Sequence, residues 1–97
     1  MGMNGRLIGK ELSFAAAAHR FPHAELAIRR LMNHSEAFCD LCQELAEAKA
    51  ALSRVAQTTP EDLREERTRE WLELIDLLVA ELREALGLGR RKPGQNQ

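Results

Sequence analysis

The stretch EAFCDLCQELAEAKAALSRV, residues 36–55, carries the pattern that decides the fold. Its large apolar residues recur in alternating steps of three and four, the a/d seam of a helix that packs lengthwise against another helix. A second stretch, WLELIDLLVAEL at residues 71–82, repeats this spacing. Together they predict an all-α fold in which two long helices, residues 36–57 and 60–86, form an antiparallel, coiled-coil-like hairpin. The seam residues expected to hold the assembly together are Phe38, Leu41, Leu45, Leu52, Trp71, Ile75, Leu78 and Leu82.

Local signals bound both long helices. Between them, in the segment TTPED, Thr59 suits the N-cap position, Pro60 the first helical position, and Asp62 the acidic member of a capping box. Ser35 is expected to cap the first long helix through its hydroxyl oxygen. Gly87 is expected to end the second one, because glycine adopts the left-handed conformation of a C-cap at little cost.

One or two shorter helices are expected ahead of the hairpin. Residues 1–9 hold three glycines and an asparagine, which predicts a flexible lead-in. The run ELSFAAAAHR consists mostly of good helix formers and predicts a helix over residues 10–20. Pro22 suits the first turn of the next helix, which we expect to continue to a break before the hairpin. The tail GLGRRKPGQNQ, residues 87–97, has no periodicity and is expected to be disordered, which leaves residues 10–86 as one helical domain.

The composition agrees with an all-helical protein. Of the 97 residues, 44% are hydrophobic, 4% are aromatic and none is tyrosine, a balance that is poor in strand formers. A chain of this length has room for one modest core and little room for a large catalytic cleft. No local arrangement of serine, histidine and acid supports a catalytic triad. We therefore expect a protein without enzymatic activity and without a cofactor.

The last helix carries more apolar surface than one seam uses. A helix that is apolar over so wide an arc needs more than one packing partner. Either the helix that begins at Pro22 folds onto it, or a second copy of the chain does. An isolated two-helix hairpin is too small to be stable on its own core, so we expect self-association into a homodimer or larger bundle, and contact with another protein. The additional apolar residues are Leu72, Leu74, Leu77, Val79 and Leu86.

Cys39 and Cys42 raise the alternative of a metal or redox sensor. They lie three apart on the expected helix, near enough to share one metal, with His34 and His23 as further candidate ligands. A structural zinc site usually has a second cysteine pair, and the sequence contains only these two cysteines. A helix N-terminus can lower a thiol pKa, which leaves thiol reactivity open. The spacing favours packing beside the seam, where a thiol behaves as a small hydrophobe.

The formal net charge of -1 hides an uneven distribution. Residues 1–34 carry five basic and two acidic side chains, residues 35–86 carry six and thirteen, and residues 87–97 carry three and none. Basic ends leave open a small nucleic-acid-associated regulator that uses Arg29, Arg30 and the tail, although the acidic hairpin would repel the same polyanion. The low cysteine count and the lack of an apolar run long enough to span a bilayer predict a cytoplasmic protein without a membrane contact.

The stretch FPHAELAIRRLMNHSEAFCDLCQELAEAKAALSRV, followed by LREERTREWLELIDLLVAEL, resembles the YdcH-like family of small, uncharacterised proteobacterial helical hairpins over about residues 21–86. The resemblance implies a bacterial cytoplasmic hairpin with no known catalytic residues. This sequence departs from the family pattern in Trp71, in its leucine-rich return helix and in both cysteines. The positions that carry the resemblance are Phe21, Pro22, Ile28, Leu31, Ser35, Phe38, Leu41, Glu44, Arg54, Arg67 and Asp76.

Overall fold

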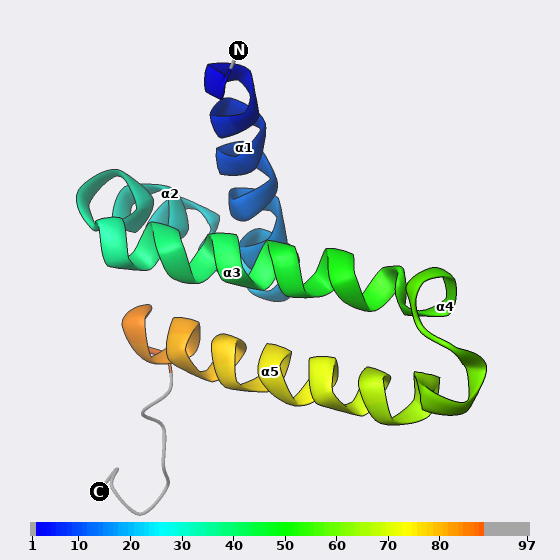
Figure 1. Cartoon of the computed structure of the whole chain (residues 1–97). Helices are drawn as coiled ribbons and strands as arrows, with labels where there is room; N and C mark the ends of the chain where they lie inside the picture. Colours follow the sequence, from blue (N-terminus) through cyan, green and yellow to red (C-terminus); the bar gives the residue numbers. More distant parts are fainter. Residues whose placement is uncertain (1, 89–97) are drawn as a thin grey trace, which may run out of the picture.

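The structure, a computed structural model, describes the backbone of residues 2–88 and the side chains of residues 9–88. These residues form α-helices and short 3₁₀ turns and no β-strand, so the fold is all-α, as the sequence predicts. The α-helices are α1 (Gly2–Arg20), α2 (Glu25–His34), α3 (Glu36–Ser53), α4 (Val55–Thr58) and α5 (Arg64–Ala85), and the 3₁₀ turns are η1 (Pro22–Ala24) and η2 (Glu61–Leu63) (Figure 1).

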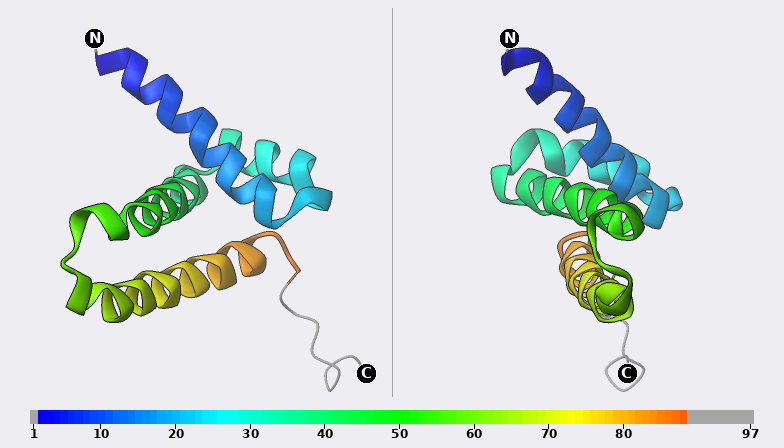
Figure 2. Two further views of the ribbon diagram at one scale, coloured as in Figure 1. Left: turned by 90° about the vertical axis from the view of Figure 1, so that its right-hand side faces the viewer. Right: turned by 45° about the vertical axis from the view of Figure 1, so that its right-hand side comes forward.

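The central element is α3. It lies beside α5, which runs in the opposite direction, and α4 and η2 connect the two (Figure 1). On the side of α3 away from α5, α1 crosses it, and α2 lies against both α1 and α3 (Figure 2). The molecule measures 49 × 42 × 20 Å, so it is about two helix diameters deep in its thinnest direction. Such an arrangement covers α3 on two sides and α5 on one.

One apolar core joins α1, α2, α3 and α5. Its largest fully buried side chains are Ile28 of α2, Leu45 and Cys42 of α3, and Leu82 of α5. The contribution of α1 is a run of buried alanines centred on Ala17, which is fully buried. Small side chains let α1 lie close against α3, although each alanine removes little apolar area from water.

A single residue, Ser35, separates α2 from α3. Its backbone is extended, with φ −135° and ψ 115°. Its amide donates to the carbonyl of Leu31 at 2.8 Å and so closes α2. Its hydroxyl oxygen accepts a hydrogen bond from the amide of Phe38 at 3.1 Å and caps α3. The predicted N-cap at Ser35 is therefore confirmed.

At its other end the hairpin stops at Gly87, as predicted. Gly87 has φ +78°, the left-handed conformation that disfavours side chains. Its amide donates to the carbonyl of Glu84 at 3.0 Å, and the amide of Leu88 donates to that of Arg83 at 2.9 Å. These two bonds form a Schellman motif, which satisfies carbonyls that the end of α5 leaves unpaired. The predicted disordered tail lies outside the described residues from position 89 onward.

The first helix begins earlier than the sequence predicts. The expected start is near Lys10, whereas α1 begins at Gly2, so the backbone of the predicted flexible lead-in is helical from that residue. A glycine inside a helix costs only about 1 kcal/mol relative to alanine. The leucine, isoleucine, methionine and arginine between these glycines are compatible with a helix, and they outweigh the glycine signal.

The connection between the two long helices also differs from the prediction. The first one is interrupted at Arg54, which has φ −106° and ψ 8°, so that α4 is a separate turn. Pro60 has ψ 147° and precedes η2 instead of occupying the first position of a helix. Neither η2 nor α5 has a side-chain cap, so the expected capping box of Thr59 and Asp62 does not form. The chain stays extended through Thr59 and Pro60, which provides the length needed to reach from one helix to the other.

Candidate protein interface

The eight residues that the sequence predicts for assembly serve the core of the single chain. Five of them are buried, and three are partly buried and pack against the same core. Because these side chains already contact the rest of their own chain, they stabilise the hairpin, and a partner would have to contact other residues. The buried residues are Phe38, Leu45, Ile75, Leu78 and Leu82, and the partly buried ones are Leu41, Leu52 and Trp71.

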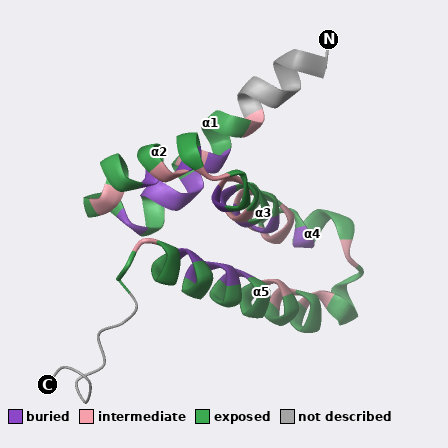
Figure 3. Ribbon diagram, turned by 90° about the vertical axis from the view of Figure 1, so that its left-hand side faces the viewer, coloured by how far each residue is buried: buried purple, intermediate pink, exposed green. Residues whose placement is uncertain are grey.

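The two faces of α5 differ in exposure. Its buried residues face α3, and the side away from α3 is exposed (Figure 3). On that exposed side, which we call the outer face of α5, Leu74 is 39% and Leu77 is 63% exposed. Leu72, which is 46% exposed, lies on the opposite flank of the helix. The helices α1 and α2, which were the candidates to cover this arc, lie on the other side of α3.

Charged residues border the leucines of the outer face. Arg67 and Glu70 form an ion pair, with 3.3 Å between Nε and Oε1, and both side chains are at least half exposed. An exposed pair of this kind contributes less than about 1 kcal/mol, because water screens it. Glu81 and Glu84 lie further along the helix and border a shallow hollow beside Leu77. An apolar centre with a charged border is the usual anatomy of a protein interface.

The cysteines belong mainly to the core. Cys42 is fully buried, and burial, together with the neighbouring Cys39, raises the pKa of its thiol to about 12. A thiol with so high a pKa stays protonated at neutral pH and is a poor nucleophile and a poor metal ligand. Cys39 is partly buried and donates its thiol proton to the carbonyl of Met32, with 3.5 Å between the heavy atoms. Among the described residues, no group of three or more His, Cys, Asp or Glu side chains comes together to hold a metal.

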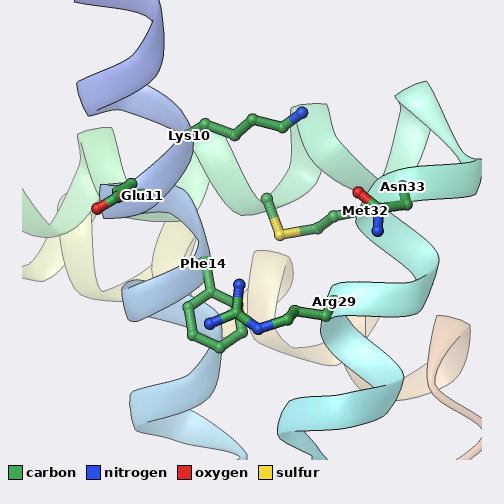
Figure 4. Close-up of a pocket in the computed structure, with 6 residues that line it drawn as sticks. All are labelled: Lys10, Glu11, Phe14, Arg29, Met32 and Asn33. Carbon is green, nitrogen blue, oxygen red and sulfur yellow. The ribbon is translucent and has the colours of Figure 1, made fainter.

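A cleft of about 370 Å³ opens between α1 and α2 (Figure 4). At its lower end the guanidinium of Arg29 lies 4.0 Å from the centre of the Phe14 ring. This cation–π contact is worth about 0.5–1 kcal/mol at an exposed site and ties α2 to α1. Glu11 points away from Arg29 (Figure 4), so the two do not form an ion pair across the cleft. No ion pair or hydrogen bond joins the side chains that line it. They are Lys10, Glu11, Phe14, Arg29, Met32 and Asn33.

The basic residues named for nucleic-acid binding have different places. Arg29 is engaged with Phe14, whereas Arg30 is exposed on α2. The basic residues of the tail lie outside the described residues. Proteins that bind nucleic acid tightly typically make about six to ten phosphate contacts, and α2 offers two adjacent cations. The geometry of α2 therefore adds little to the nucleic-acid alternative.

Sequence reasoning singled out Leu72, Leu74 and Leu77 as excess apolar residues. It missed Leu12 of α1, which is 57% exposed, Leu26 of α2, which is 76% exposed, and two leucines beside α5, Leu63 and Leu88. Each of the two is 43% exposed, and they lie just beyond the two ends of α5. Leu63 lies inside the expected helix of residues 60–86, but the apolar periodicity was counted only from Trp71. Extending the count toward the N-terminus would have found it, since eleven residues make about three helical turns.

Within the residues that the structure describes, no helix combines the length and the apolar character needed to cross a membrane. No family model matches the chain, and no curated protein or solved structure does either.

Proposed function

We propose that this chain is a non-enzymatic helical module that works by binding another protein chain through the outer face of α5. The observation that carries the proposal is the exposure of Leu74 and Leu77 on a helix whose other side is buried in the core. Covering apolar surface is favourable by about 25 cal/mol per Å². Single exposed leucines are common on proteins, whereas neighbouring exposed leucines on one face of a helix are typical of a contact surface.

Three further features support this proposal. The core uses the seam residues internally, which leaves the outer face of α5 as the largest uncovered apolar surface on a helix of the hairpin. The cleft between α1 and α2 and the buried thiol of Cys42 supply no catalytic pair. The resemblance to the YdcH-like family implies the same kind of protein, and membership of that family and a bacterial, cytoplasmic location remain part of the proposal.

Site-specific photo-crosslinking in cells that produce the protein tests it. A photoreactive amino acid replaces Leu77 on the outer face, and in a control it replaces Glu44, which is exposed on α3. We expect discrete crosslinked products from position 77 and far fewer from position 44, because only the former lies inside the docking surface. Equal, weak labelling from both positions would contradict the proposal.

The mass of the crosslinked product identifies the class of partner. A product of twice the chain mass of 10.9 kDa contains a second copy, and any other mass contains a different protein. Both results support docking through α5, so this experiment leaves the choice between them to a separate measurement on the purified chain.

A further inference from the structure

Four of the five exposed leucines along α5 and at its ends are spaced symmetrically, and the fifth, Leu72, lies on the opposite flank of the helix. Leu63 precedes Leu74 by eleven residues, and Leu88 follows Leu77 by eleven. All four are at least 39% exposed. The set therefore has the same spacing from either end, with its midpoint halfway between Leu74 and Leu77. Leu74 and Leu77 lie within α5, whereas Leu63 is the last residue of η2 and Leu88 follows Gly87.

We propose that the outer face of α5 is covered by a second copy of this chain, with the two α5 helices antiparallel about a two-fold axis at that midpoint. This inference rests on the proposed function and names its partner. In this register Leu74 lies opposite Leu77 of the second copy, and Leu63 lies opposite its Leu88. A two-fold interface uses the same patch on both copies, so the patch must be self-complementary. The symmetric spacing of the leucines meets that condition.

The charges of the outer face fit the same register. Arg67 and Glu84 are equally far from the midpoint, so each Arg67 faces Glu84 of the other copy. A shallow hollow of about 330 Å³ beside Leu77 is bordered by Glu81 and Glu84 and also by Arg83. Glu70 faces Glu81 across the axis, which is a repulsion, and Arg67, 3.3 Å from Glu70 within its own chain, offsets only part of it because it also faces Glu84.

The charges also distinguish the antiparallel pair from a parallel one. A parallel pair in register would place Arg67 beside Arg67 and Glu84 beside Glu84, which is unfavourable at both ends of the interface. The antiparallel pair replaces both repulsions with two attractions. The orientation of the dimer is therefore an outcome of the sequence of α5 and is open to a charge-reversal experiment.

The size of the face predicts how tightly the copies associate. The 22 residues of α5 span about 33 Å, and a contact strip one helix diameter wide covers on the order of 350 Å² per copy. Stable complexes bury about 800 Å² per partner. We therefore expect a reversible dimer whose dissociation constant is micromolar or higher.

Sedimentation equilibrium of the purified full chain tests the proposal. Between about 1 μM and about 1 mM, the mass is expected to rise from 10.9 kDa toward twice that value. Leu77→Lys places a charge on each side of the axis and should leave the chain monomeric over this range, with its helical circular dichroism unchanged. Leu72→Lys, at an exposed leucine on the opposite flank of the same helix, should associate like the wild type.

Charge reversal tests the register. Arg67→Glu alone and Glu84→Arg alone should each weaken association at least about tenfold, because like charges then face each other across the axis. An equimolar mixture of the two variants should associate again, since both cross-dimer pairs then have opposite signs. The two residues lie about 25 Å apart along one helix, so contact within a chain does not account for such rescue.

A wild-type chain that stays monomeric throughout, or a Leu77→Lys variant that associates like the wild type, overturns the second copy as partner. A mixture that fails to restore association overturns the antiparallel register. If the pure chain is monomeric while crosslinking from position 77 joins a different protein, the docking function stands without the dimer. If neither experiment joins anything to this face, both proposals fail.

Discussion

The helices α3 and α5 share a heptad pattern and lie side by side, yet they differ in how far they are covered. α1 and α2 lie on one side of α3, and α5 lies on the other side. None of the large apolar side chains of α3 is highly exposed. The more leucine-rich helix, α5, leaves Leu72, Leu74 and Leu77 exposed. Apolar content alone therefore did not decide which helix became central.

Side-chain size explains the difference. The face that α1 offers to α3 is a row of buried alanines around Ala17. A face of small side chains can approach a neighbouring helix closely and gain many van der Waals contacts. The bulky leucines of α5 would hold an alanine face further away, so they suit a partner that brings large side chains. A leucine-rich helix such as α5 can therefore lie at the surface of a small protein with one face uncovered.

The largest loss of stability should come from a charged side chain buried in α3. Leu45 is fully buried in α3, and Leu45→Asp would bury a carboxylate without a partner. We expect a cost above about 4 kcal/mol, which is a large part of the 5–15 kcal/mol that stabilises a typical domain. Circular dichroism should show the loss of helical signal and of cooperative melting.

The matched control is Ala50→Asp, at an exposed position of the same helix. It introduces the same side chain and should cost no more than about 1 kcal/mol, mainly through helix propensity. A Leu45→Asp chain with the helicity and melting temperature of the wild type would contradict the assignment of Leu45 to the core.

A pair of alanine substitutions compares the two faces of α5 directly. Leu82 is fully buried, and Leu82→Ala should lower the free energy of unfolding by about 2–5 kcal/mol. Leu77 is 63% exposed, and Leu77→Ala should change it by about 0.5 kcal/mol or less in the monomer. Urea unfolding at low protein concentration measures both values. Equal costs would mean that the second face of α5 is covered within the chain.

The buried thiol of α3 gives a prediction for pH dependence. The pKa of Cys42 rises from its ordinary value of 9.0 to about 12, because burial disfavours the thiolate. The folded chain therefore keeps a proton that the unfolded chain loses above pH 9, so stability is complete below about pH 9 and falls as pH rises toward 12. The slope is at most about 1.4 kcal/mol per pH unit.

Urea unfolding between about pH 8 and about pH 11 measures this slope. Cys42→Ala should remove its contribution, whereas Cys39→Ala at the partly buried neighbour should leave most of it in place. If both variants kept the wild-type slope, the thiol of Cys42 would be accessible to water in the folded chain.

Periodicity and local caps are the parts of this fold that the sequence predicts well. The steps of three and four from Phe38 to Leu52 indicate a helix without any knowledge of its partner. Ser35 and Gly87 act through bonds to residues within five positions, so local sequence is sufficient to predict them. The interruption at Arg54 has no such local signal, because it depends on where the chain must turn toward α5.

The open face of α5 could be predicted only in part. The sequence shows that Leu74 and Leu77 exceed the needs of one seam, but either α2 or a second copy could have covered them. The choice depended on where α1 and α2 lie, and the alanines around Ala17 bury so little area that they give a weak signal in a hydrophobicity pattern. These alanines stabilise the fold by letting α1 lie close to α3, and this effect depends on how the two helices pack.

The smallest expected loss of stability comes from removing a side chain at the N-terminus of either long helix. The hydroxyl oxygen of Ser35 accepts from the amide of Phe38 at 3.1 Å, so Ser35→Ala should cost about 1 kcal/mol. Thr59 was expected to cap α5 in the same way, but neither η2 nor α5 has a side-chain cap. Thr59→Ala should therefore cost clearly less than Ser35→Ala in urea unfolding. A larger cost at Thr59 would mean that the capping box forms in solution and that α5 begins at Pro60, as its sequence alone predicts.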